Sequence, residues 1–164
     1  MEVNVLDDQS DVEIDVRALD VLVGLVLEAE SVRCDELSVH FVSKEKITEL
    51  HGEFFDDPTP TDCITFPIDS PHSATTEPDE DEPYVYLGDV FICPKVALEQ
   101  STTFETEASE ELTLYLVHTL LHLVGYEDTD PASEEEMRLA ESRHMHRLKE
   151  AGAVLRINYQ SDYH

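Results

Sequence analysis

The chain has 164 residues, enough for one domain with its own core but too few for two domains of ordinary size. It carries 38 acidic residues against 10 lysines and arginines, a formal net charge of −28. Such a surface repels polyanions at long range and argues against binding to bare duplex nucleic acid, so DNA is not an expected partner. The hydrophobic share of 41% still indicates a folded protein.

Alternation of apolar and polar residues predicts short β-strands. The expected strands are residues 2–6, 37–42, 63–66, 84–87 and 89–93. Gly88 separates the last two, which indicates a hairpin or a bulge at this point. Residues 69–83 mix proline, serine, threonine and acidic residues without periodicity, so we expect a solvated acidic loop there.

Apolar residues spaced three and four apart predict five helices between and after these strands. They are residues 16–29, 46–55 with Ser43 as N-cap, 94–104, a helix from Ser109 to just before Gly125, and 133–149 followed by Gly152. Helices and strands mixed in one small domain indicate an α+β or α/β class. We expect a single domain over residues 1–157 and a C-terminal tail over 158–164.

The three cysteines are Cys34, Cys63 and Cys93, an odd number outside any CxxC spacing. They indicate neither a disulfide framework nor a thiolate zinc site. The N-terminus has no basic segment before an apolar run, and no stretch approaches the roughly 18 apolar residues that span a bilayer. We therefore expect a protein of the reducing cytoplasm, with no membrane partner.

One stretch, HTLLHLVGYED at residues 118–128, is rich in possible metal ligands. Four residues make little more than one helical turn, so His118 and His122 project from the same face and can share a metal ion. Gly125 can turn the chain back and bring a third, anionic ligand to them. The candidates are Glu127, Asp128 and Asp130. Three protein ligands would leave a position open for water, as in a catalytic zinc site.

An HxxxH pair also occurs by chance on helices, where it needs no metal. Here Leu116, Leu120 and other leucines surround the pair, so imidazole nitrogens beside this apolar surface need a partner, which a metal would supply. Thr119 stands where an HExxH zinc protease carries its glutamate, which disfavours metalloprotease chemistry.

The same stretch resembles the HGxLHLxGyDH signature of the YbeY family of bacterial rRNA maturation endoribonucleases. PTDCITFP at 60–67 is similar to the family's pTDVLSFP strand, LGDVFI at 87–92 to its LGDIvI strand, and EEM at 135–137 to its C-terminal helix. The blocks keep the family's order and spacing over roughly residues 45–145.

This resemblance implies an α+β domain in which helices cover a small mixed sheet and the metal-binding helix lines a cleft. It implies a metal-dependent endoribonuclease specific for single-stranded RNA, acting in small-subunit rRNA maturation and ribosome quality control. The implied partners are single-stranded rRNA and the small ribosomal subunit or its assembly factors. The implied cofactor is one Zn²⁺ or another divalent ion, held by His118, His122 and Asp128.

The chain departs from the family pattern at several positions. Asp128 replaces the family's third histidine, Thr119 replaces a glycine, and Phe55 stands where an arginine is expected. A carboxylate is an acceptable zinc ligand, but a lost arginine removes a cation that would hold phosphate. Lys95 is the candidate substitute, and Thr65 in the 60–67 block is expected to face the substrate. No general base is assigned.

His51 falls on an asparagine position of the family, although a surface histidine is the simpler interpretation. Two other functions stay open. The chain could be a ribosome-associated assembly factor with a structural metal and weak or lost nuclease activity, as the changes at Phe55 and Asp128 suggest. It could also be a metallohydrolase acting on an ester or amide.

Overall fold

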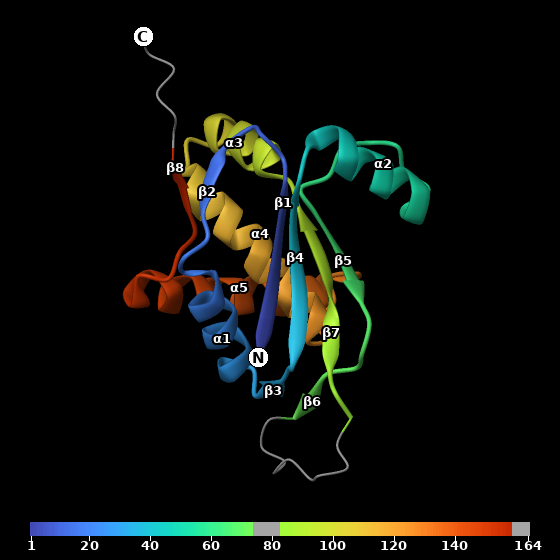
Figure 1. Ribbon diagram of the computed structural model, residues 1–164, viewed down its shortest axis with the longest axis vertical. Helices are drawn as coiled ribbons and strands as arrows, with labels where there is room; N and C mark the ends of the chain where they lie inside the picture. Colours follow the sequence, from blue (N-terminus) through green and yellow to red (C-terminus); the bar gives the residue numbers. More distant parts are fainter. Residues whose placement is uncertain (74–82, 159–164) are drawn as a thin grey trace.

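The computed structural model describes residues 1–73 and 83–158, and its centre is a four-stranded mixed sheet (Figure 1). The strands lie in the order β1 (Glu2–Asp8), β4 (Glu36–Val42), β7 (Tyr86–Ile92) and β5 (Cys63–Pro67). The first three are parallel, and β5 runs antiparallel to β7. The α+β class is therefore confirmed.

Gly88 lies inside β7 and interrupts neither the strand nor its pairing with β5. Glu36 pairs with Tyr86, but Ser38, two residues further on, pairs with Asp89. β7 thus contains one extra residue relative to β4, so the irregularity at Gly88 is a bulge and not a hairpin.

The described residues form five helices around this sheet. They are α1 (Leu19–Ala29), α2 (Lys44–Phe55), α3 (Pro94–Thr103), α4 (Ala108–Leu123) and α5 (Pro131–Ala151). α4 is central, because it packs on β5 and β7 and also contacts α1, α3 and α5 (Figure 1). Every helix expected from the sequence is present.

The helix starts agree with the sequence in part. Ser43 caps α2 as expected, since its Oγ accepts the backbone N–H of Lys46 at 3.1 Å. Ser109 does not cap α4, which begins one residue earlier, and its hydroxyl instead accepts the N–H of Ile157. α5 begins at Pro131 rather than at Ser133, with Asp130 as its N-cap.

Two pairs of very short strands were not predicted. β2 (Glu13–Asp15) pairs with β8 (Arg156–Asn158), and β3 (Val32–Arg33) pairs with β6 (His72–Ser73). The expectation of a solvated loop over residues 69–83 is therefore wrong at β6, where the chain forms a short strand, while residues 74–82 of that loop lie outside the described residues. β8 includes Asn158, the first residue of the expected tail, and 159–164 are likewise outside the description.

The core joins the sheet to α4. Leu37, Val39 and Phe41 alternate along β4 and are fully buried, as are Leu116 and Leu120 on α4. Burying each such side chain is worth about 1.5–3 kcal/mol, so α4 is held firmly on the sheet. Among the residues described, no helix has both the length and the apolar character that a bilayer crossing demands.

Candidate metal centre

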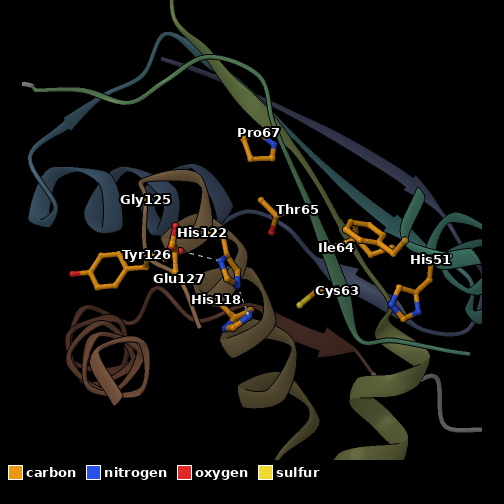
Figure 2. A pocket seen from close by; sticks show the side chains of 11 residues that line it. His51, Cys63, Ile64, Thr65, Pro67, His118, His122, Gly125, Tyr126 and Glu127 are labelled. Atoms are coloured by element: carbon orange, nitrogen blue, oxygen red, sulfur yellow. Dashed lines mark hydrogen bonds between the residues drawn. The ribbon is translucent and has the colours of Figure 1, made fainter. Parts of the chain in front are cut away.

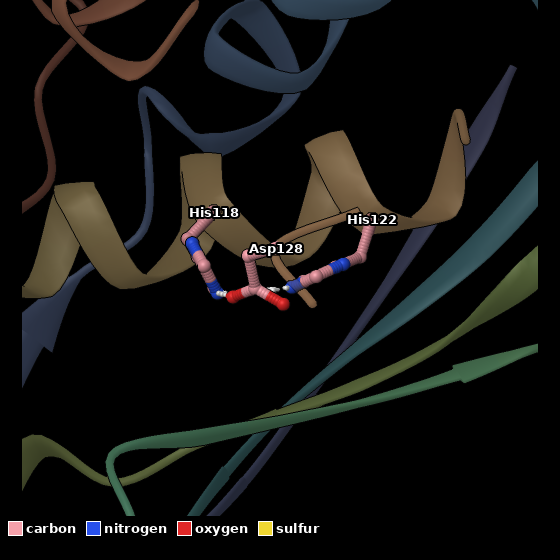
Figure 3. Close-up of side chains that lie close together, drawn as sticks. All are labelled: His118, His122 and Asp128. Atoms are coloured by element: carbon pink, nitrogen blue, oxygen red, sulfur yellow. Dashed lines mark hydrogen bonds and ion pairs between the residues drawn. The ribbon is translucent and has the colours of Figure 1, made fainter. Parts of the chain in front are cut away.

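His118 and His122 lie one turn apart near the C-terminal end of α4, on the face that looks toward β5 (Figures 2 and 3). Their side chains are 20% and 25% exposed. Their Nε2 atoms lie 3.0 Å apart, and the two rings are nearly perpendicular. The i, i+4 geometry expected from the sequence therefore brings the two imidazoles to one point.

The chain reverses immediately after α4. Gly125 has φ of +111°, a conformation that side chains disfavour, and the N–H of Tyr126 donates to the carbonyl of Leu121 at 2.9 Å. This turn brings Asp128 back to the helix, where its Oδ2 lies 3.6 Å from Nε2 of His118 and 3.6 Å from Nε2 of His122 (Figure 3).

The other two acidic candidates lie elsewhere. Glu127 is exposed on the wall of the neighbouring cavity and is outside the His118, His122 and Asp128 group. Asp130 accepts the N–H of Ser133 at 2.8 Å as the cap of α5. This hydrogen bond lowers the pKa of the Asp130 carboxyl. The turn thus presents one carboxylate, that of Asp128, to the two histidines.

The donor set of this group fits one divalent ion. Its ligand atoms all lie within 4.8 Å of one another. Ligands at 2.0–2.1 Å from a tetrahedral zinc ion are about 3.3 Å apart. The separations here, 3.0 Å between the nitrogens and 3.6 Å from each nitrogen to the carboxylate, lie on either side of that value.

Two further residues orient the imidazoles. Nδ1 of His122 lies 3.0 Å from the carbonyl oxygen of Tyr126, which can only accept, so Nδ1 carries the proton and Nε2 keeps its lone pair. On the other ring, Nδ1 of His118 lies 3.7 Å from Oε1 of Glu141 on α5. These partners were not predicted, because neither belongs to the HxxxH spacing.

Glu141 is buried, with a side chain only 5% exposed, and Arg138 donates to both of its carboxylate oxygens. Burial alone would raise the pKa of this carboxyl, but the contact with His118 and the charge of Arg138 together lower it. Glu141 is therefore held as a carboxylate beside His118.

A cavity of about 430 Å³ opens in front of the histidines, between α4, β5 and the end of α2 (Figure 2). Its lining residues are His51, Phe55, Cys63, Ile64, Thr65, Pro67, His118, His122, Gly125, Tyr126 and Glu127. Thr65, expected to face the substrate, is among them. Within the described part of the chain, no lysine or arginine lines this cavity.

Phe55 and Lys95 lie in different surroundings. Phe55, at the family's arginine position, lies on the cavity wall and is 52% exposed. Lys95 is exposed in the first turn of α3 and does not line the cavity, because Pro94, Val96 and Ala97 are the residues that α3 turns inward. Lys95, the expected substitute for the family's arginine, is therefore not part of the cavity wall on which Phe55 lies.

Two cavity residues were not recognised from the sequence. His51, taken for a surface histidine, lines the cavity, and its Nδ1–H donates to the carbonyl of Thr59 at 2.8 Å. The one signal in the sequence that could have placed His51 at the site is that it falls on an asparagine position of the family.

Cys63 is the second of these cavity residues. Burial and the nearby Asp62 carboxylate raise the pKa of the Cys63 thiol well above its ordinary value, so Cys63 stays protonated at neutral pH.

The fold and site define a small α+β domain in which two histidines of the central helix and an aspartate of the following turn meet at a cavity. The family model described as Endoribonuclease YbeY matches residues 4–149. The chain belongs to the YbeY family.

Relatives agree with this assignment, and a solved structure shares the fold. The chain is 42% identical over 147 residues to a protein of Protochlamydia amoebophila named Endoribonuclease YbeY, covering 90% of this chain and 93% of the relative. It is 38% identical to the protein of that name from Chlamydia trachomatis serovar D, covering 94% and 92%. The solution structure of a Thermotoga maritima protein, 21% identical, shares the fold with a TM-score of 0.56 over 92% of this chain and 94% of that one.

Proposed function

We propose that this protein is a metal-dependent endoribonuclease that cleaves single-stranded RNA. The observation that carries the proposal is the convergence of His118, His122 and Asp128 beside a cavity, in a chain whose relatives are named endoribonucleases. We place its activity in the cytoplasm, in small-subunit rRNA maturation and ribosome quality control, with the small subunit or its assembly factors as partners.

The three side chains would hold one ion, zinc or another divalent metal, through two imidazole nitrogens and a carboxylate oxygen. When bound, such an ion polarises a phosphoryl oxygen and lowers the pKa of its bound water. The carbonyl of Tyr126 and the carboxylate of Glu141 keep the two imidazole rings in place. This positioning keeps the lone pair of the His122 Nε2 available for the ion.

The cavity itself supports a single strand as substrate. Its volume of about 430 Å³ is in the range of sites for small ligands, so it would take one nucleotide unit with its phosphate. A base held in a duplex could not enter such a site without leaving its stack. Thr65 offers a hydroxyl on the wall made by β5.

A second candidate is an assembly factor in which the metal is structural and the nuclease activity is weak or lost. Phe55 favours this alternative, because it places an apolar ring on a cavity wall where an arginine would hold phosphate.

The deciding experiment incubates the purified protein with an end-labelled single-stranded RNA and with a duplex of the same sequence. We expect endonucleolytic products from the single strand only, their loss with a chelator, and their return when zinc or another divalent ion is added back. His118→Ala is the negative control. Stoichiometric metal without cleavage would favour the assembly factor, whereas cleavage of an ester or amide and not of RNA would identify a different hydrolase.

A further inference from the structure

A second, smaller hollow lies on the other side of Tyr126, between the end of α1 and α5. It encloses about 280 Å³, and its lining residues are Ala29, Glu30, Tyr126, Arg143, His144 and Arg147. In Figure 2 the ring of Tyr126 points away from His118 and His122. Tyr126 lines both hollows and so forms a wall between them.

This hollow contains an unusual share of the chain's positive charge. The chain has only 10 lysines and arginines, and two arginines one helical turn apart line this one hollow. Several of the others are paired with carboxylates, such as Lys44 with Glu99 and Lys149 with Glu110. Over residues 1–73 and 83–158, no carboxylate oxygen lies within 4.0 Å of either Arg143 or Arg147. These guanidiniums are therefore available to an anion.

The carboxylate in the hollow is already engaged. Oε2 of Glu30 accepts the Nε2–H of His144 at 2.6 Å, and their side chains are only 13% and 4% exposed. This buried contact fixes the end of α1 against α5 and so shapes the hollow. Nη2 of Arg143 lies 3.4 Å from the hydroxyl of Tyr126, which directs this guanidinium to the hollow.

The position of Tyr126 connects this hollow to the metal centre. Its backbone carbonyl accepts from Nδ1 of His122, while its ring and hydroxyl belong to the second hollow. An RNA strand with one phosphate in the main cavity would therefore have to pass only Tyr126 to reach the two arginines. Among the described residues, no lysine or arginine lines the main cavity, so apart from a bound metal ion its walls offer the strand no positively charged side chain of these types.

We propose that the hollow lined by Arg143 and Arg147 binds a backbone phosphate of the RNA strand, next to the nucleotide held in the main cavity. This inference rests on the proposed function. Guanidinium groups bind phosphate through paired N–H donors, and two of them one turn apart on the same helix face can both contact one phosphate. The hollow would add two guanidinium groups to the charge of the metal ion, because no lysine or arginine is found among the described residues that line the main cavity.

The test measures binding of a fluorescent single-stranded RNA by anisotropy, with a chelator present so that the strand stays intact, at several salt concentrations. The variant is the double substitution Arg143→Gln and Arg147→Gln. We expect binding about tenfold weaker at low salt, and a slope of log affinity against log salt that is shallower by about 0.7 for the lost phosphate contact. Substitution of both arginines by lysine should keep the slope, because lysine also neutralises phosphate.

A matched control removes two other exposed cations, with Lys46→Gln and Arg156→Gln together. It loses the same charge, but these residues lie outside both hollows, so its salt slope should equal that of the wild type. An unchanged slope in the arginine-to-glutamine variant, or an equal change in the control, would overturn the inference while leaving the proposed function standing. Failure of the wild type to bind or cleave RNA would instead overturn the proposed function, and the phosphate site with it.

Discussion

Oε1 of Glu141 lies 3.7 Å from Nδ1 of His118, so a buried carboxylate of α5 orients a histidine of α4. Partners of this kind fix the ring of a metal ligand and raise its basicity. Glu141 is itself held by Arg138 and is almost inaccessible to solvent.

Glu141→Gln should therefore lower metal affinity about tenfold, measured by competition with a chelator of known affinity. Glu150→Gln on the same helix is the control, because Glu150 is exposed and, among the residues that the structure describes, its ion-pair partner is His146, far from the metal ligands in the sequence. Equal affinities in the wild type and the Glu141 variant, with both folded by circular dichroism, would show that Glu141 does not position His118.

Asp128 is expected to be the third ligand. Asp128→Ala should weaken metal binding at least about tenfold, measured by calorimetry, because it removes one of three donors. Asp128→His should retain the metal, since imidazole also ligates zinc. Glu127→Ala should have little effect, because Glu127 lies outside the donor group. A large loss in Glu127→Ala would instead assign the third position to Glu127.

Phe55 lies on the wall of the main cavity, at the position where the family has an arginine. Phe55→Arg should raise kcat/KM for single-stranded RNA about tenfold, because a guanidinium there would stabilise charge on the phosphate. Phe54→Arg is the matched control, since Phe54 is the neighbouring residue, is 58% exposed and does not line the cavity. An equal gain in the control would attribute the effect to net charge and not to position.

The Asp130 cap gives α5 a pH-dependent contribution to stability. Its pKa in the folded protein lies below the ordinary 3.8, mainly through the hydrogen bond from the Ser133 N–H, so its stabilisation is present above about pH 4 and is lost as the pH falls through the folded-state pKa. Asp130→Ala should lower the Tm by about 3 °C at pH 7 and by less at pH 3.

Asparagine caps a helix about as well as aspartate but does not titrate. The Tm of Asp130→Asn at pH 7 should therefore lie closer to that of the wild type than the Tm of Asp130→Ala does. A difference between the wild type and Asp130→Ala that stays constant from pH 7 to pH 3 would contradict this account of the cap.

Gly88 allows β5, β7 and α4 to approach closely. A Cβ at this position would lie 2.5 Å from the carbonyl oxygen of Phe66 and 2.6 Å from Cδ2 of Leu123. Gly88→Ala should lower the free energy of unfolding by about 3 kcal/mol, measured in urea, because a backbone oxygen cannot move aside cheaply. Gly24→Ala in α1 meets nothing within 4 Å and should instead raise it by about 0.5–1 kcal/mol. A neutral Gly88→Ala would show that the strands can separate without cost.

Elements that depend on local spacing could be predicted from the sequence. The alternation of Leu37, Val39 and Phe41 predicts β4, and the i, i+4 spacing of His118 and His122 predicts that their side chains meet. Both results follow from the fixed periods of strand and helix, which need no information from distant parts of the chain. Gly125 predicts the reversal after α4 for the same reason.

The distant residues that complete the site could not be predicted in this way, because they come together through the packing of the fold. Glu141 and His51 reach it from α5 and α2, and no local pattern marks either as a neighbour of the HxxxH pair. The pairing of β2 with β8 likewise joins segments more than 140 residues apart. Such contacts depend on how the helices pack on the sheet, because side chains from separate elements meet only after the core has formed.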